Sequence, residues 1–365
     1  MSEIRSRSKL QNPTDLVHPQ IRSLSAYRVE PFTGNVKLDA MESPYGFSES
    51  LRKKWLEYIA ETDVNRYPDP NATDVKDTLR KVFEIPDSLQ LTLGNGSDEL
   101  LQLLQLAVGG YGKTIMAPQP SFAMYEIIAR FTRAEFVGVD LDENFRLPRD
   151  SWLSAIERNQ PACIFIAYPN NPTGNFFDEE LIEETVRVAD GLVVVDEAYH
   201  AYSGQSIMAM LEKYENLVIV RTLSKSGFAG LRVGYMMSHP SLSAEFEKVR
   251  FPYNIGVLAQ RSAVFALSNW DRIRLASDHI IQLRDSMFSQ LQRMDGIEVY
   301  PTQANFITIK VRNESATRIF ETLQRDGVLI KNLHGQHPLL ANCLRLTVGT
   351  EDENGQLLAA LEKCL

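Results

Sequence analysis

The sequence predicts an α/β fold in which a mostly parallel seven-stranded sheet lies between helices, with a smaller α+β domain at the C-terminal end. Seven short, nearly continuous apolar runs lie between residues 89 and 237, and segments of helical period alternate with them. After about residue 260 this alternation ends. Strands that are apolar on both faces belong to a sheet covered on both sides, and such sheets are mostly parallel. Alternating strands and helices indicate a layered α/β domain.

Each apolar run is short enough for one strand of that sheet. The runs are Leu89–Gly94, Thr114–Pro118, Glu135–Leu141, Cys163–Pro169, Leu192–Glu197, Leu217–Leu223 and Val233–Met237. Helical period is clear in Glu99–Val108 and Glu179–Asp190. These two segments are therefore predicted to be helices that cover the sheet.

The C-terminal third carries longer helical patterns and fewer strands. The pattern predicts one or two helices over Gln260–Met294, strands at Asn305–Val311 and Cys343–Gly349, and helices at Ser315–Asp326 and Glu351–Lys363. Residues 1–45 are polar and predict a short helix and an extended arm. We expect an arm (1–45) that contributes to the small domain, a large domain (46–258) and a small domain (259–365).

Composition narrows the class of protein. The 365 residues are 44% hydrophobic and 23% charged, which excludes a disordered chain, a collagen and a disulfide scaffold. With 38 basic and 47 acidic residues the net charge is −9, which argues against a nucleic-acid partner because such partners need clustered Lys and Arg. The three scattered cysteines indicate a reducing compartment.

No apolar run reaches the roughly 18 residues that a membrane-spanning helix needs, and the N-terminal segment lacks the apolar core of a signal peptide. We therefore expect a cytoplasmic protein with no membrane partner. No Cys/His cluster has zinc-like spacing, so no metal site is expected.

Polar residues follow four of the predicted strands. They lie in Gly94–Asp98, Tyr168–Gly174, Asp196–Tyr199 and Thr222–Lys225. In open α/β sheets, ligands bind outside the carboxyl ends of the strands. One crevice is therefore predicted to hold glycines, amides, a carboxylate, a phenol, hydroxyls and an ammonium.

Each segment alone has an ordinary explanation: a strand-to-helix turn at Gly94–Asp98, a capping Asp196, a surface Lys225. Together they supply what pyridoxal phosphate (PLP) requires. That cofactor needs a lysine for its aldehyde, a carboxylate that keeps its ring nitrogen protonated, donors to its ring oxygen and an anion site for its phosphate. The combination predicts a PLP enzyme.

Motifs along almost the whole chain support this interpretation. They are Leu38–Gly46, Asn65–Pro70, Gly94–Leu100, Pro120–Tyr125, Tyr168–Gly174, Val193–Tyr199, Arg221–Tyr235, Pro252–Asn254, Ala304–Phe306 and Cys343–Thr350. On these motifs the chain resembles the fold type I, aspartate-aminotransferase-like PLP enzymes, and within them the histidinol-phosphate aminotransferases. One departure is Met41, which stands where some relatives have Asn.

The resemblance implies a role for individual residues. Lys225 forms the Schiff base with the cofactor and later shuttles the proton, Asp196 pairs with the pyridinium nitrogen, and Asn171 and Tyr199 donate to the ring oxygen. Phe122 stacks on the cofactor ring. The expected phosphate ligands are Ser224 and Arg232, with Thr222 and the amides of Gly96, Ser97 and Asp98.

The resemblance also implies substrates and assembly. Arg345 is expected to bind the anionic end of the substrate, with contacts from Asn171 and Tyr27. Tyr67 is expected to reach the cofactor phosphate of a neighbouring subunit, which implies a homodimer. The implied reaction is a ping-pong transfer of the amino group between L-histidinol phosphate and 2-oxoglutarate, giving imidazole acetol phosphate and L-glutamate in histidine biosynthesis.

Three alternatives stay open at this point. An aromatic amino-acid aminotransferase of the same family shares nearly all these motifs. A PLP-dependent decarboxylase of a phosphorylated amino acid is a second alternative. A regulatory module fused to a DNA-binding domain is disfavoured, because the net charge is acidic and the fold is expected to begin by about residue 25–40.

Overall fold

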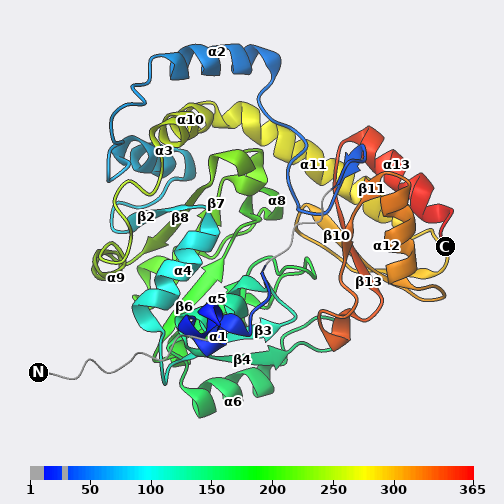
Figure 1. The fold of residues 1–365 in the computed structure, drawn as a ribbon, viewed down its shortest axis with the longest axis horizontal. Coiled ribbons are helices and arrows are strands. Elements are labelled where there is room, and N and C mark those ends of the chain that lie inside the picture. The colour runs from blue at the N-terminus through cyan, green and yellow to red at the C-terminus, as the bar shows by residue number, and fades with distance from the viewer. Residues whose placement is uncertain (1–11, 27–31) are drawn as a thin grey trace, which may run out of the picture.

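The computed structural model describes residues 12–26 and 32–365, which form a larger and a smaller body (Figure 1). The larger body is built on a seven-stranded sheet with the order β2-β8-β7-β6-β5-β3-β4. Only β8 runs antiparallel to its neighbours in this sheet. The strands are β2 (Gln90–Asn95), β3 (Thr114–Gln119), β4 (Glu135–Asp140), β5 (Cys163–Ala167), β6 (Leu192–Asp196), β7 (Leu217–Thr222) and β8 (Val233–Ser238). Each overlaps one predicted run, so the predicted sheet is confirmed.

Helices cover both faces of this sheet (Figure 1). Alternate residues of the strands belong to different cores: Ile164 and Val193 pack in one cluster, while Phe165 and Val194 pack in another. The helices of this body are α2 (Glu49–Ala60), α3 (Thr73–Phe83), α4 (Ser97–Val108), α5 (Met124–Thr132), α6 (Arg149–Asn159), α7 (Glu179–Val188), α8 (His200–Ser203), α9 (Pro240–Phe246) and α10 (Val257–Ser268). Burial on both faces explains why these strands are continuous apolar runs.

The smaller body has its own sheet and core. Four antiparallel strands have the order β12-β13-β10-β9, and β1 pairs with β11 in parallel. These strands are β1 (Val36–Lys37), β9 (Ile297–Val299), β10 (Phe306–Val311), β11 (Val328–Leu329), β12 (Lys331–Asn332) and β13 (Cys343–Thr347). The helices α11 (Trp270–Leu291), α12 (Ala316–Arg325) and α13 (Glu351–Glu362) complete it. Its strands β10 and β13 were predicted, whereas β1, β9, β11 and β12 are too short to show a period.

The N-terminal segment reaches both bodies. A 3-10 helix (Pro13–Leu16) and α1 (Pro19–Arg22) precede β1, and α1 contacts α5. Through β1, which pairs with β11, the segment after residue 31 joins the smaller body. The predicted boundary between residues 258 and 259 falls inside α10, which packs on α2 and α3, whereas α11 continues onto β9, β10 and α13; we therefore propose Asn269 as the junction between the two domains.

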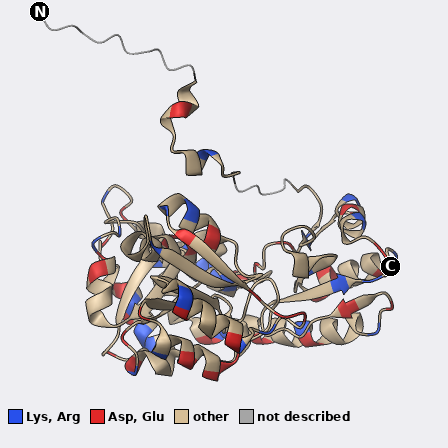
Figure 2. Cartoon of the chain, turned by 90° about the horizontal axis from the view of Figure 1, so that it is seen from below, with Lys and Arg blue, Asp and Glu red and all other residues tan. Residues whose placement is uncertain are grey.

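Basic and acidic residues are interspersed over both bodies (Figure 2). Within the described ranges, no helix combines the length and the apolar character needed to cross a membrane. An ion pair is buried beside the sheet: Arg221 on β7 lies 2.8 Å from Glu197, and their side chains are 5% and 0% exposed. Ser206 and the Ile207 amide donate further hydrogen bonds to Glu197. This pair joins the carboxyl ends of β6 and β7, next to the predicted site.

We expect Arg221→Leu to destabilise the protein by about 3–5 kcal/mol, because the change leaves the Glu197 carboxylate buried without its counter-ion. Urea unfolding followed by circular dichroism measures the effect. The matched control is Arg312→Leu, which removes an exposed pair with Glu298 (3.5 Å, side chains 62% and 45% exposed). A surface pair contributes at most about 1 kcal/mol. Equal losses for the two variants would contradict a structural role for the buried pair.

Candidate active site

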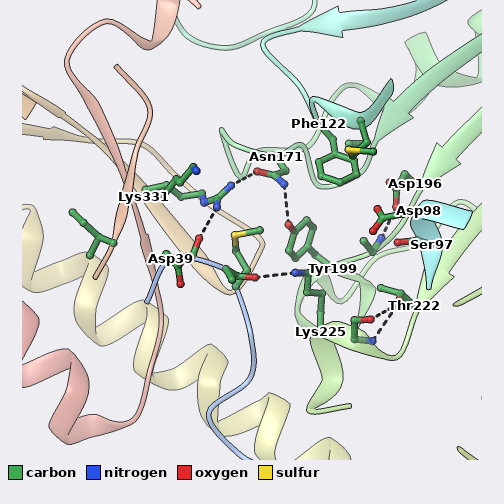
Figure 3. Close-up of a pocket in the computed structure, with 18 of the residues that line it drawn as sticks. Asp39, Ser97, Asp98, Phe122, Asn171, Asp196, Tyr199, Thr222, Lys225 and Lys331 are labelled. Atoms are coloured by element: carbon green, nitrogen blue, oxygen red, sulfur yellow. Dashed lines mark hydrogen bonds between the residues drawn. The ribbon is translucent and has the colours of Figure 1, made fainter. Parts of the chain in front are cut away.

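A cavity of about 720 Å³ lies between the two bodies, at the carboxyl ends of β5, β6 and β7 (Figure 3). The large body contributes residues that follow these strands and the start of α4. The small body contributes β13, β12 and the segment after β1. A ligand in this cavity would therefore touch both bodies. Its position matches the rule for open α/β sheets.

Asp196, the last residue of β6, presents a buried carboxylate to the cavity. Its Oδ2 accepts a hydrogen bond from the Tyr125 hydroxyl at 2.9 Å, and its Oδ1 accepts one from the Ala198 amide at 3.1 Å. Burial raises the pKa of Asp196 to about 6, and the two hydrogen bonds oppose that rise. A cationic group placed beside this carboxylate would therefore stabilise its ionised form.

Lys225 follows β7 and lies in a short 3-10 helix, Ser224–Ser226. Its Nζ donates to the Ala40 carbonyl at 2.9 Å. Burial, followed by the positive charge of Arg345, lowers the pKa of Lys225 to about 8. A lysine with a lowered pKa holds a larger neutral, nucleophilic fraction near neutral pH.

A hydrogen-bonded chain crosses the cavity from the large body to the small one (Figure 3). Asn171 Nδ2 donates to the Tyr199 hydroxyl at 3.1 Å, and Arg345 Nη1 donates to Asn171 Oδ1 at 2.6 Å. Arg345 Nη2 also donates to the Asp39 carbonyl at 2.8 Å. The guanidinium on β13 is thereby held in a fixed orientation beside residues that follow β5 and β6.

At the other end of the cavity, hydroxyls and a guanidinium meet the start of α4. Thr222 Oγ1 donates to Ser224 Oγ at 2.9 Å, and Arg232 Nη1 donates to the same oxygen at 3.3 Å. Gly96 precedes α4 with φ +82°, and a Cβ there would lie 2.3 Å from Arg232 Nη2. The positive φ favours glycine here, and a side chain at this position would displace the Arg232 guanidinium. Amides of a helix start, hydroxyls and an arginine are suited to a phosphate.

The structure brings most of the predicted residues together. Those that line the cavity are Ser97, Asp98, Phe122, Asn171, Asp196, Tyr199, Thr222, Ser224, Lys225, Arg232 and Arg345. Gly96 lies beside them against Arg232. Tyr67 does not line this cavity; its side chain is 81% exposed and stacks on Tyr253 at 4.5 Å. Tyr27 lies outside the described residues.

Several lining residues were given no role by the sequence. Lys37, Asp39, Met41 and Lys331 line the end of the cavity formed by the small body, and Tyr125 contacts Asp196 from behind. Lys331 pairs with Arg345 across β12 and β13, which places two cations side by side. The strand β12 has two residues and carries no periodic signal. Among the described residues, no group of three His, Cys, Asp or Glu side chains could hold a metal ion.

Comparisons with known proteins agree with this geometry. The model of the family "Aminotransferase class I and II" matches residues 33–361. Histidinol-phosphate aminotransferase 2 of Nitrosococcus oceani is 46% identical over 346 residues, which cover 95% of this chain and 96% of that protein. The histidinol-phosphate aminotransferase of Chromobacterium violaceum is 42% identical over 348 residues, which cover 95% and 97%.

A solved structure shares the fold. The histidinol-phosphate aminotransferase from Sinorhizobium meliloti, solved in complex with pyridoxal-5'-phosphate, superposes with a TM-score of 0.83 at 23% identity, covering 99% of this chain and 98% of that one. The resemblance recognised in the motifs is confirmed by the family model and by the similar sequences. The chain belongs to the class I and II aminotransferases and, within them, to the histidinol-phosphate aminotransferase family.

Proposed function

We propose that this protein is a PLP-dependent aminotransferase that moves the amino group between L-histidinol phosphate and 2-oxoglutarate in histidine biosynthesis. The observation that carries the proposal is a cavity with anion-binding groups at both ends and Lys225 between them. One end holds Ser224 and Arg232, and the other holds Arg345 and Lys331. Relatives that are 39–46% identical over nearly their whole length carry the same family name.

The residues present fit PLP. Ser224, Arg232 and the start of α4 would hold its phosphate, and the Asp196 carboxylate would face its ring nitrogen. Tyr199 and Asn171 would donate to its ring oxygen, since both lie in the same wall of the cavity. When bound, the cofactor's protonated ring would supply the electron sink for the charge left by removal of the α-proton.

The protein's own groups would then handle the proton and the substrate. Lys225 Nζ, with its lowered pKa, is suited to take the proton from the substrate's α-carbon and to deliver it to the carbon on the other side of the amino nitrogen. Asp196 would keep a proton on the facing ring nitrogen by its negative charge. Asn171 is hydrogen-bonded to both Tyr199 and Arg345, so that one hydrogen-bonded chain would orient the cofactor and the substrate.

The pair of cations on β12 and β13 favours histidinol phosphate over an aromatic amino acid. A carboxylate carries one negative charge, and a bidentate arginine satisfies it. A phosphate carries close to two negative charges and has more acceptor oxygens, so a second cation beside Arg345 adds to its binding. Arg345 would accept one of the two carboxylates of 2-oxoglutarate in the other half of the reaction.

A homodimer is part of the proposal. Aromatic side chains that do not line the cavity are exposed: Tyr67 is 81% and Phe251 77% exposed, and Tyr67 stacks on Tyr253. Exposed aromatic residues of this kind are typical of subunit contacts. A second copy would cover them, and Tyr67 would complete the phosphate site of that copy.

The three free cysteines support a cytoplasmic location, and no nucleic-acid or membrane partner is expected.

Mixing the PLP-bound protein with L-histidinol phosphate, without a keto acid, is expected to convert the bound cofactor to its amino form within a short time. L-Phenylalanine should do so more slowly. Stopped-flow absorption measures both rates.

Lys331→Met should lower kcat/KM for histidinol phosphate about tenfold, because a charged hydrogen bond is lost, and should affect kcat/KM for phenylalanine less. The exposed Lys363→Met is the control. Faster conversion by phenylalanine would instead favour the aromatic aminotransferase.

Lys225→Ala is expected to abolish the absorption band of the lysine-bound cofactor and to lower turnover at least about a hundredfold, because the nucleophile and the proton carrier are lost. The control Lys213→Ala changes an exposed lysine outside the cavity. Spectra of the purified variants with added PLP measure the effect. A spectrum that Lys225→Ala leaves unchanged would overturn the cofactor assignment.

Sedimentation is expected to show a dimer, and subunit mixing tests which active site Tyr67 serves. Lys225→Ala and Tyr67→Ala homodimers should each be weakly active. Their heterodimer should regain one intact site, since the wild-type Tyr67 of one chain would meet the wild-type Lys225 of the other. No gain of activity on mixing, or a fully active monomer, would refute the shared site.

A further inference from the structure

Tyr125 is a buried side chain that the proposed reaction does not yet use. It lies in α5, behind the cavity wall, and is 1% exposed. Its hydroxyl donates to Asp196 Oδ2 at 2.9 Å. The hydroxyl is therefore aimed at the carboxylate that would face the cofactor ring.

The position of this hydroxyl is fixed from three sides. The Tyr125 ring stacks on Phe165 of β5, with centroids 4.8 Å apart and planes 9° apart, and Phe122 packs edge-on at 5.6 Å. Gln105 Nε2 of α4 donates to the Tyr125 carbonyl at 3.3 Å. A tyrosine held in this way delivers its hydrogen bond without a further loss of freedom.

The Asp196 carboxylate is correspondingly held on both oxygens. Tyr125 occupies a lone pair of Oδ2 and the Ala198 amide occupies one of Oδ1. A carboxylate has about four acceptor positions, so one remains on each oxygen. The two hydrogen bonds set the plane of the carboxylate and leave its remaining acceptor positions for a ligand in the cavity.

We infer that Tyr125 is a positioning residue, which keeps the Asp196 carboxylate ionised and oriented toward the ring nitrogen of the cofactor. The inference rests on the cofactor site of the proposed function, though not on the identity of the amino donor. Tyr125 acts through Asp196 and does not itself line the cavity.

The electrostatics around Asp196 support this role. Burial raises its pKa to about 6, and the negative charges of Asp98 and Glu197 act in the same direction. The hydrogen bond from Tyr125 is the first of the two opposing causes, followed by that from Ala198. Without Tyr125 the pKa of Asp196 would rise further, so that more of the carboxyl would be protonated near neutral pH. A protonated carboxyl does not stabilise a protonated ring nitrogen.

The test is a double-mutant cycle between Tyr125→Phe and Asp196→Asn, read first by the dissociation constant of PLP. Tyr125→Phe keeps the ring and its stacking and removes one hydroxyl. We expect it to weaken PLP binding about tenfold, the usual scale for a hydrogen bond to a charged group. In the Asp196→Asn protein the same change should alter binding by less than about twofold, because the charge it acts through is gone.

The pH dependence of the rate and a control variant separate a positioning role of Tyr125 from a packing role. The half-reaction is measured as a function of pH with whichever amino donor the wild type accepts. In Tyr125→Phe, the fall in its rate on the acidic side of the pH profile should begin at a higher pH than in the wild type. The control Tyr214→Phe removes a tyrosine–carboxylate hydrogen bond of the same 2.9 Å length, to Glu183 away from the cavity, and should change neither readout. Thermal unfolding of the cofactor-free variants reports whether they fold.

Additive losses in the cycle, or unchanged PLP affinity in Tyr125→Phe, would overturn the inference and leave Tyr125 as a core residue. If Tyr125→Phe does not fold, 3-fluorotyrosine introduced at position 125 replaces it. That more acidic phenol is a stronger donor, and it should tighten PLP binding and move the acidic side of the rate profile to lower pH. No effect, or the opposite one, contradicts the inference. Because PLP affinity is measured without substrate, these outcomes stay distinct from a failure of histidinol phosphate as the donor.

Discussion

The buried carboxylate of Asp196 is the constraint on which the rest of the site depends. A carboxylate at the end of an interior strand loses its hydration, and burying it without partners costs several kcal/mol. The surrounding residues reduce this cost with the Tyr125 hydroxyl and the Ala198 amide, and the cavity leaves space for a cationic partner. A charge kept in such a place favours a bound ligand that carries a proton opposite it.

The remaining polar groups are arranged around this charge by topology. The parallel strands β5, β6 and β7 end at one edge of the sheet, so that residues following each strand face the same space. Behind them, the Arg221–Glu197 pair joins two of these strand ends without entering the cavity. The supporting side of this turn thus carries an ion pair, and the cavity side carries the Asp196 carboxylate.

The second body supplies the groups that a single α/β domain lacks. Arg345 on β13 reaches Asn171, and the segment after β1 supplies the Asp39 and Ala40 carbonyls to Arg345 and Lys225. Three segments distant in the sequence therefore meet around one cavity. A substrate bound there would contact both bodies and lie beside Lys225.

Local sequence patterns were enough to predict the seven strands of the large sheet, two of the helices that cover it and the polar residues that follow the strands. These features follow from local periodicity and from the need to cover both faces of a sheet. Only the tertiary structure decided that Lys331 lies beside Arg345 and that Tyr125 supports Asp196. Lys331 lies on a two-residue strand, and Tyr125 lies on the buried face of α5 with core residues. Neither contact joins neighbours in the sequence. Their pairing depends on how whole elements pack, which no local pattern encodes.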